Sequence, residues 1–232
     1  GTTEKVKFYI ESVAPNTTGV LYAHCPERVI PGKVLEELVG NDRVVGGLDN
    51  ESTQMAVEFY STFVQGEVLK TDARTAELCK LTENSFRDVN IAFANELSLI
   101  CDHLEVNIWE LIRLANRHPR VDVLQPGPGV GGHCIAVDPW FVVSSAPDQA
   151  KLIKTARLVN DAKPLWVINK VKEKAKKFKS PTIACLGVTF KANIDDLRES
   201  PALNIVKALK NENIGKIIVC EPNVSKLEGF EL

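Results

Sequence analysis

The feature that most restricts the fold of this chain is a stretch, residues 67–118, that contains neither glycine nor proline. Asp72 is a suitable N-terminal cap, so the stretch predicts one long helix ending near Leu104 and a shorter helix starting near Asn107. Large apolar residues fall on every side of the longer helix, and this pattern indicates burial on several sides. A partner subunit or the rest of the chain could supply the cover, and the sequence leaves both open.

Helix-like and strand-like runs alternate on both sides of this helical centre. Before it, we predict helices over 4–11 and 51–64 and strands over 19–24, 43–47 and 68–71. After it, we predict a Gly- and Pro-rich loop over 119–139, a helical region over 149–179, a strand over 182–188, a helix over 201–210 and a strand over 216–220. The predicted fold class is α/β around a central all-helical part, with an incomplete α/β unit at each end.

Composition excludes several classes of function. Lys and Arg total 28 against 30 Asp and Glu, so we expect no sequence-independent binding to nucleic acid or to anionic membranes. The six cysteines form no C-x-x-C pair and no zinc-like spacing, so we expect neither a metal site nor a disulfide framework. The sequence shows no signal peptide and no apolar run that would span a bilayer, and we expect a reduced, cytoplasmic protein.

The loop that leads to Cys134 is the most informative segment. Four glycines lie within six residues, 127–132, where they permit tight turns and a close approach of a ligand to the backbone. A cysteine directly after such a loop fits an activated thiolate. A turn that ends in a buried, inert cysteine explains the same pattern, so both interpretations stay open.

Four polar residues, Glu77, Lys80, Asn84 and Arg87, share one face of the long predicted helix. A buried lysine is costly unless it is paired or used, so Lys80 could transfer a proton or stabilise an oxyanion. For the isolated motif, a structural ladder of ion pairs is the favoured explanation.

Two further motifs follow predicted strands, where open α/β sheets place functional side chains. Glu27 lies in the run CPERVIPG and could be a general base or a substrate ligand; a solvated loop carboxylate is the alternative. Lys191 and Arg198 lie between the late strand and its helix and suit an anionic ligand, whereas the nearby Asp, Ser and Pro suit helix capping. The sequence has no G-x-G-x-x-G or G-x-x-x-x-G-K-S/T fingerprint.

Taken in order, the segments KLTENSFRDVNIAFANE, HPRVDVLQPGPGVGGHCIAVDP and GVTFKANIDDLRESP resemble the UDP-glucose/UDP-mannuronate dehydrogenase family. The resemblance runs from about residue 1 to residue 223. The runs CPERVIPG and PGPGVGGHCIAVDPW are similar to the branch that acts on UDP-N-acetylhexosamines. These motifs are long and specific.

The resemblance implies a domain order. Residues 1–70 would be the end of an NAD-binding Rossmann domain, 71–179 a central helical dimerisation domain, and 180–232 the start of a Rossmann-like domain that binds the UDP-sugar. The chain would then begin after the NAD fingerprint and stop within the last domain. A homodimer through the long helix is implied, with NAD as cofactor and a UDP-sugar as substrate.

The resemblance also implies a four-electron oxidation of a sugar C6 alcohol to a carboxylate, with UDP-N-acetyl-D-mannosamine as the expected substrate. Cys134 would form a thiohemiacetal and then a thioester. Lys80 and Asn84 would stabilise the C6 oxyanion, Asp138 would hold a water or tune the thiol, and Glu27 would assist hydrolysis of the thioester. Most of the substrate contacts implied come from Glu27, Arg28, Lys80, Asn84, Arg87, Gly131 and Lys191. Arg120 would reach the partner's sugar site, and Arg198 would contact the substrate or the cofactor.

Departures from the UDP-glucose branch favour a different sugar. Pro31 stands where that branch has a second carboxylate, Val137 where it has lysine, and His133 where it has serine. UDP-N-acetylglucosamine and UDP-glucose are the alternative substrates. Two other classes stay open: a cysteine hydrolase or acyltransferase that pairs Cys134 with His118 or His133, and an inactive dimerising fragment.

Overall fold

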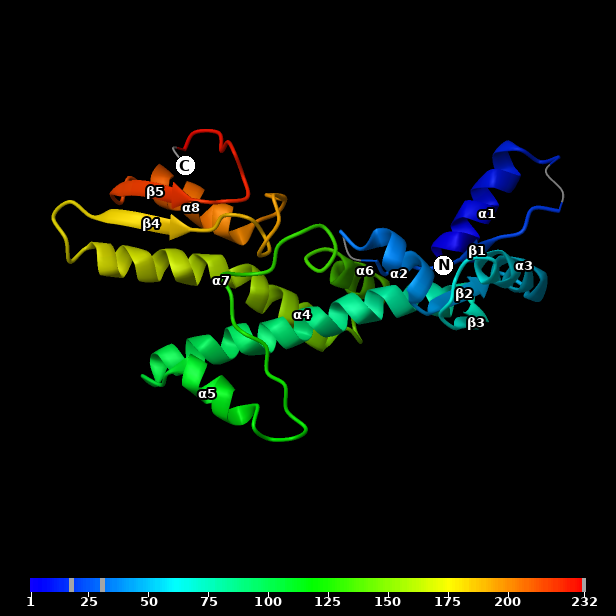
Figure 1. Ribbon diagram of the computed structural model, residues 1–232, viewed down its shortest axis with the longest axis horizontal. Helices are drawn as coiled ribbons and strands as arrows, with labels where there is room; N and C mark the ends of the chain where they lie inside the picture. The colour runs from blue at the N-terminus through cyan, green and yellow to red at the C-terminus, as the bar shows by residue number, and fades with distance from the viewer. Residues whose placement is uncertain (17–18, 30–31, 231–232) are drawn as a thin grey trace. The chain divides into compact units, whose positions relative to one another are not determined.

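The computed structural model describes residues 1–16, 19–29 and 32–230 (Figure 1). Pro31 therefore lies outside the described residues. The chain divides into two compact units, Gly1–Glu83 and Asn84–Leu232, and the long helix runs from the first into the second. Each unit is described by itself.

The first unit is a small sheet with helices. Its elements are α1 (Thr2–Val13), β1 (Ala23–His24), α2 (Val34–Gly40), β2 (Arg43–Gly47), α3 (Asn50–Ser61) and β3 (Val68–Asp72). The strands lie in the order β1-β2-β3, with β1 antiparallel and β3 parallel to β2. The predicted strand over 43–47 is confirmed, the strand predicted over 19–24 is reduced to β1, and α2 was not predicted.

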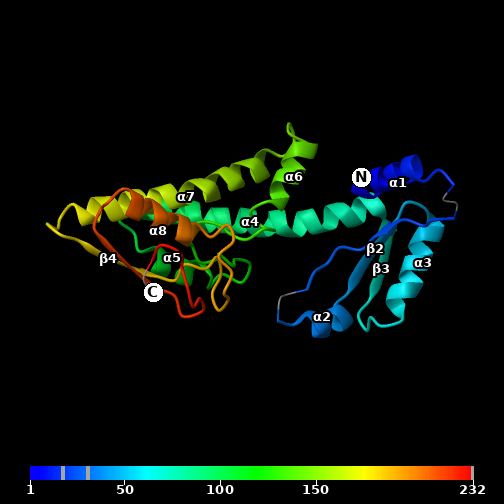
Figure 2. The same ribbon diagram turned by 90° about the horizontal axis from the view of Figure 1, so that it is seen from above.

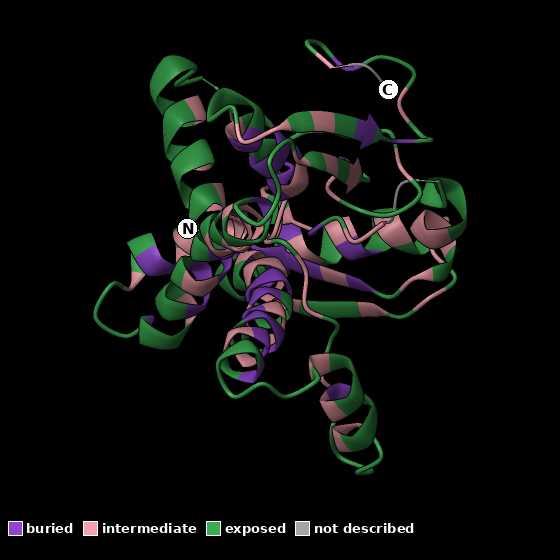
Figure 3. Ribbon diagram, turned by 90° about the vertical axis from the view of Figure 1, so that its left-hand side faces the viewer, coloured by how far each residue is buried: buried purple, intermediate pink, exposed green. Residues whose placement is uncertain are grey.

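Strand β2 is tightly enclosed by its neighbours. Val45 is fully buried, and an added Cβ at Gly46 would lie 2.2 Å from the Asp72 carbonyl oxygen. An added Cβ at Gly47 would lie 2.4 Å from the backbone nitrogen of Thr53. The two glycines therefore serve close packing of β2 against β3 and α3, whereas α1 has no buried residue (Figure 3).

Helix α4 (Ala73–His103) is the predicted long helix. Asp72 caps it, since its carboxylate accepts a hydrogen bond from the Thr75 amide at 3.0 Å. The helix's buried face carries small and polar residues: Ala76, Asn84, Ser85, Asp88, Ala92, Ala94, Asn95 and Ser98. Its large apolar residues Leu78, Phe86, Phe93 and Ile100 are exposed. The alternative that the rest of the chain covers the apolar side chains is thus wrong for these four, and cover by a partner subunit stays a prediction.

The second unit contains the rest of α4 and the elements after it. These are α5 (Ile108–Ala115), α6 (Asp138–Ser145), α7 (Lys151–Ala175), β4 (Thr182–Leu186), α8 (Pro201–Asn211) and β5 (Lys216–Cys220). Asn107 caps α5 through hydrogen bonds from the amides of Trp109 and Glu110. Helix α6 was not predicted. Helices α4 and α7 lie side by side in both views (Figures 1 and 2), and hydrogen bonds join them.

The β4-α8-β5 unit is a parallel pair of strands with a crossover helix, as predicted. Its core contains Val188, Leu203, Val206, Val219 and Leu227. Ser200 caps α8 and also donates to the Val188 carbonyl at 2.7 Å. This contact fixes one end of the connection 189–200, which lies next to the candidate site.

Two features are absent from the described residues. None of their helices combines the length and the apolar character needed to cross a membrane. Nor do they contain a group of three or more His, Cys, Asp or Glu side chains that could hold a metal ion.

Candidate functional site

Cys134 is exposed in the turn that leads into α6. Its carbonyl oxygen accepts hydrogen bonds from the amides of Val137 at 3.0 Å and Asp138 at 2.8 Å. The turn thereby joins the cysteine rigidly to the first turn of α6. The alternative of a buried, inert cysteine is wrong for this thiol.

Two of the predicted site residues meet directly. The Asn84 amide nitrogen donates to the Asp138 carboxylate at 2.6 Å, and Asn84 is buried. Lys80 is half-buried one turn earlier on the same face of α4. Helix α4 therefore presents an ammonium and an amide in series, and the amide contacts the helix that starts after Cys134.

The glycines before Cys134 pack against the connection 189–200. An added Cβ at Gly131 would lie 2.6 Å from the Glu199 carbonyl oxygen, and one at Gly132 would lie 3.0 Å from the Phe190 ring. The Gly132 amide donates to the Arg198 carbonyl at 3.3 Å. These glycines let the two loops approach closely, so Gly131 has a packing function here besides its predicted contact with substrate.

Arg198 lies within electrostatic reach of the proposed nucleophile. Its guanidinium donates to Asp196 from Nε and Nη2, at 3.0 and 2.6 Å. These hydrogen bonds lower the pKa of Asp196 to about 2 and raise the pKa of Arg198, and the thiol of Cys134 adds to the second effect. Lys191 is exposed on the same connection.

Glu27 is held by a buried guanidinium that the sequence did not single out. Its carboxylate accepts from the amides of Arg28 at 2.6 Å and Val29 at 2.9 Å, and from Arg43 Nη1 at 3.3 Å. Burial would raise the pKa of Glu27, but these amides and the charge of Arg43 lower it on balance. Arg43 is only 2% exposed, and its position in a buried strand was the one signal in the sequence.

The remaining predicted residues are placed as follows. Arg28 pairs with Glu83 through Nε at 2.9 Å. The Glu77 carboxylate accepts hydrogen bonds from the amides of Thr2 and Thr3. In the described structure Glu77 is therefore not part of the ladder of ion pairs suggested for this face of the helix. Arg87 and Arg120 are both exposed, and neither forms an ion pair within the described ranges.

The alternative of a cysteine hydrolase requires a Cys–His pair. His133 is exposed beside Cys134, and it makes a small contribution to the lowered pKa of Asp196. His118 accepts a hydrogen bond from the Arg120 amide at 3.3 Å. Among the described residues no hydrogen bond joins either imidazole to the thiol.

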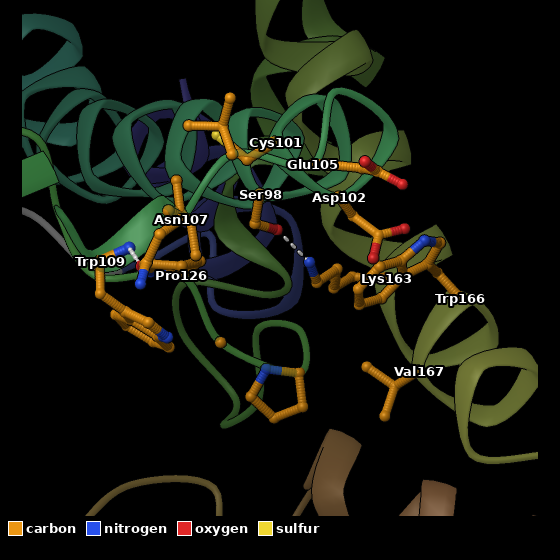
Figure 4. Close-up of a pocket in the computed structure, with 14 residues that line it drawn as sticks. Ser98, Cys101, Asp102, Glu105, Asn107, Trp109, Pro126, Lys163, Trp166 and Val167 are labelled. Carbon is orange, nitrogen blue, oxygen red and sulfur yellow. Dashed lines mark hydrogen bonds between the residues drawn. The ribbon is translucent and has the colours of Figure 1, made fainter. Parts of the chain in front are cut away.

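Two cavities flank the loop that precedes Cys134. One, of about 460 Å³, is lined by His133, Arg157, Asn160 and Glu199, among others. The other is a groove of about 710 Å³ between α4, α5 and α7 (Figure 4), in which the Lys163 ammonium points to Ser98 and lies over the Trp166 ring. Burial lowers the pKa of Lys163, and the carboxylate of Asp102 opposes this effect.

Comparison with known families decides the class of protein. Residues 1–64 match the model of the NAD binding domain of the UDP-glucose/GDP-mannose dehydrogenase family, 74–162 match its central domain and 184–231 its UDP binding domain. The chain belongs to the UDP-glucose/GDP-mannose dehydrogenase family. The resemblance seen in the sequence and the predicted fold class, with partial Rossmann-like units around a helical centre, are confirmed.

Individual members of the dehydrogenase family are closely similar. An NDP-N-acetyl-D-galactosaminuronic acid dehydrogenase from Ralstonia solanacearum is 63% identical over 214 residues, which are 90% of this chain and 51% of the relative. A UDP-N-acetyl-D-mannosamine dehydrogenase from Campylobacter jejuni is 63% identical over 205 residues, 88% of this chain and 50% of the relative. The solved UDP-N-acetyl-mannosamine dehydrogenase of S. aureus superposes with a TM-score of 0.85 at 44% identity, covering 99% of this chain and 56% of that one. The chain thus spans about half the length of these dehydrogenases.

The part of the NAD domain present here fits the cofactor only incompletely. The sequence has no dinucleotide fingerprint. The space beside the described glycines of β2 is occupied by the chain's own backbone and is therefore not open to a pyrophosphate. Residues 1–64 therefore contribute to the frame of that domain, and Arg198 remains the one residue predicted to contact the cofactor.

Proposed function

We propose that the protein containing this chain, at the full length of its relatives (called the full-length protein below), oxidises UDP-N-acetyl-D-mannosamine at C6 to the uronate with NAD. The observation that carries the proposal is the 2.6 Å hydrogen bond between Asn84 and Asp138. It joins the polar face of α4 to the turn of Cys134, as the predicted chemistry requires. Family membership favours this dehydrogenase over the cysteine hydrolase.

The residues of this chain have defined tasks in the proposed reaction. NAD, when bound, supplies the hydride acceptor for each of the two oxidations. The Cys134 thiolate adds to the C6 aldehyde to give a thiohemiacetal, whose oxidation leaves a thioester. Water then cleaves the C–S bond and releases the carboxylate and the thiol. Because the sugar stays bound to sulfur, the aldehyde does not escape between the two oxidations.

Lys80 and Asn84 support the oxygen that becomes negative in this sequence. They lie one turn apart on the same face of α4, so their donors point to the same side of the helix. Preorganised donors of this kind commonly supply a large part of the rate enhancement. Asp138 accepts from Asn84 and thereby fixes the orientation of that amide.

Removal of the charge beside Glu27 is expected to shift the pH dependence of thioester hydrolysis. Arg43 helps to lower the pKa of Glu27, so Arg43→Gln raises that pKa toward its ordinary value. Hydrolysis that needs ionised Glu27 is retained above the pKa and lost as the pH falls through it. The acidic limb of the kcat profile therefore moves to higher pH in Arg43→Gln of the full-length protein. Arg43→Lys keeps the charge and serves as the control; an acidic limb that stays in place in Arg43→Gln contradicts the role given to Glu27.

Binding of the UDP-sugar is proposed to use the residues that the family resemblance implies. Gly131, Lys191 and Arg198 lie on the two loops that pack together beside Cys134. The others proposed are Glu27, Arg28, Lys80, Asn84 and Arg87, with Arg120 reaching the partner's site. We retain 1–70, 71–179 and 180–232 as the proposed domain boundaries.

A screen of the full-length protein tests the choice of sugar. NADH formation is measured with UDP-N-acetyl-D-mannosamine and with the N-acetylglucosamine, N-acetylgalactosamine and glucose analogues. We expect the highest kcat/KM with the mannosamine sugar and two NADH per sugar. A preference for the galactosamine sugar would replace our proposal with the activity named for the Ralstonia relative, which is as similar as the Campylobacter one. Cleavage of a thioester or ester without NAD would favour the cysteine hydrolase. Turnover by the 232-residue chain alone would contradict the alternative that this chain is an inactive dimerising fragment.

The exposed apolar residues of α4 support a homodimer through this helix. Leu78, Phe86, Phe93 and Ile100 recur every seven or eight residues and so follow one face. We expect Phe93→Glu to convert a dimeric full-length protein to a monomer, because a buried carboxylate at an apolar interface is unpaired. Light scattering after size exclusion measures the mass. Phe178→Glu, at an equally exposed phenylalanine outside α4, is the control; a Phe93→Glu protein that stays dimeric contradicts the interface.

A further inference from the structure

The loop before Cys134 has little regular structure to hold it. Residues 121–127 form neither helix nor strand, and Pro126 and Pro128 carry no amide proton. The amide of Gly127 is nevertheless satisfied: it donates to Asn95 Oδ1 on α4 at 2.9 Å. This one contact joins the loop to a set of buried side chains.

That set is a continuous series of hydrogen bonds between α4 and α7. Arg157 Nη1 donates to Asp88 Oδ1 at 2.6 Å, and Asn160 Nδ2 donates to the same oxygen at 2.8 Å. Asn95 Nδ2 donates to Asn160 Oδ1 at 2.9 Å. All four residues are at most 1% exposed. We refer to Asp88, Asn95, Arg157 and Asn160 as the buried relay.

The relay has a direction that its chemistry imposes. An ionised carboxylate only accepts hydrogen bonds, so Asn160 must present its amide nitrogen to Asp88 and its oxygen to Asn95. Asn95 must then present its own nitrogen to Asn160, which leaves its oxygen for the Gly127 amide. The Asp88 carboxylate and the Asp88 backbone carbonyl, which accepts from the same Asn160 nitrogen at 3.1 Å, thus together decide which atom of Asn95 faces the loop. A reversed amide at either asparagine would place two donors or two acceptors against each other in a buried site.

Helix α4 fixes both ends of the segment that carries the cysteine. Asn95 holds Gly127 and Asn84 holds Asp138, and eleven residues separate the two asparagines. Three turns of helix correspond to about 16 Å along the axis, and both side chains fall on the same face. The opposite side of the loop is closed by α7, because an added Cβ at Gly129 would lie 3.4 Å from the Asn160 carbonyl oxygen.

We propose that the buried relay is a positioning device: it orients Asn95 so that α4 holds Gly127, and it thereby sets where the Cys134 thiol lies relative to the sugar. In this proposal the relay residues act on the position of the thiol through the loop. The role of Cys134 itself rests on the proposed function.

The test uses Asn95→Leu in the full-length protein. Leucine has the same branching and the same number of heavy side-chain atoms as asparagine but accepts no hydrogen bond from Gly127. A displacement of the thiol of about 1 Å would lower kcat roughly 100-fold, and we expect KM for the UDP-sugar to change less than about threefold. Hydrogen exchange of the peptide that contains Gly127 should accelerate about tenfold, since its amide loses its partner.

Ser98→Ala is the matched control. Ser98 is buried on the same face of α4, one turn after Asn95. Its hydroxyl accepts from Lys163 of α7 and donates to the Asn95 backbone carbonyl at 2.6 Å, so it contacts neither the Asn95 amide group nor the loop. Ser98→Ala should lower the melting temperature without changing kcat or the exchange of the Gly127 peptide. If Asn95→Leu does not fold, Asn95→Ala replaces it, because alanine is smaller and likewise offers the Gly127 amide no side-chain acceptor.

The outcomes separate the two proposals. A folded Asn95→Leu or Asn95→Ala protein with unchanged kcat and unchanged exchange overturns the positioning role, as does an equal effect of Ser98→Ala. Faster exchange together with a lower kcat supports it. If Cys134→Ser retains uronate formation, the proposed nucleophile fails, while the exchange of the Gly127 peptide still decides whether the relay holds the loop.

Discussion

The Cys134→Ser variant of the full-length protein is expected to lose uronate formation by about 10⁴- to 10⁶-fold, the range seen when a covalent nucleophile is removed. A serine hydroxyl is a much weaker nucleophile than a thiolate, so the aldehyde is not captured. The thiol is exposed in its turn, and its backbone carbonyl, not its sulfur, holds the first turn of α6. The fold should therefore survive the change.

Cys220→Ser is the matched control for this prediction. Cys220 is also exposed, at the end of β5, and has no role in the proposed site. It should retain full activity, and mass spectrometry during turnover should find the sugar acyl group on Cys134 alone. Uronate formed at the normal rate by Cys134→Ser would show that the covalent mechanism is wrong.

The helix ends and the central strands could be predicted because local chemistry sets them. Asp72 and Asn107 accept hydrogen bonds from the first amides of α4 and α5, as their residue types suggested. Strands β2 and β5 have the predicted bounds, since short β-branched runs end there in glycine or polar residues. Helix α6 was missed because Pro139 marks a loop in sequence, although proline also suits a helix's first turn.

The partners within the site could not be predicted, because they are far apart in the sequence. Asn84 and Asp138 were expected to act together only through the family resemblance, and 54 residues separate them. Arg43 supports Glu27 from a strand whose pattern indicated packing alone. In the relay, 69 residues separate Arg157 from Asp88. A polar residue on a helix does not indicate which other helix will satisfy it.

Which side of α4 is buried within the chain could not be predicted for a related reason. Its apolar residues occur on all sides, and apolarity usually indicates the buried side. Helices α4 and α7 instead meet through small and polar side chains such as Ala92 and Asn95, which allow a close approach and hydrogen bonds. The large residues Phe86 and Phe93 are left on the surface of the chain, where a second subunit is the proposed cover.

Removal of Arg157 is expected to cost about 3–5 kcal/mol of stability, because it leaves the Asp88 carboxylate buried without its countercharge. Both side chains are at most 2% exposed, and their nitrogen and oxygen atoms lie 2.6 Å apart. For a protein of this size, Arg157→Met should lower the melting temperature by roughly 6–20 °C in calorimetry. The double variant Asp88→Leu/Arg157→Met should recover more than half of this loss, since neither charge is then buried.

Lys170→Ala is the control for an exposed ion pair. Lys170 and Asp102 also lie 2.6 Å apart, but both are more than a third exposed, so the loss should stay below about 1 kcal/mol. A loss in Arg157→Met no larger than that in Lys170→Ala, or a double variant less stable than Arg157→Met, would contradict the argument.

The pH dependence of the same variant follows from the sign of the shift at Asp88. Burial raises the pKa of Asp88, and the charge of Arg157 opposes this effect. Without Arg157 the pKa rises further, so the neutral acid is the form that the folded protein tolerates. In the unfolded chain the pKa of this carboxyl group is near 4, and in the folded protein it is higher. Such a group stabilises the folded state at pH values below its unfolded pKa, and this stabilisation is lost as the pH rises through its folded pKa. The stability difference between Arg157→Met and the parent should therefore be larger at about pH 8 than at about pH 5, and denaturant unfolding at the two pH values measures it. An equal stability difference at the two pH values would mean that Asp88 stays ionised in Arg157→Met, with the hydrogen bond from Asn160 as its remaining support.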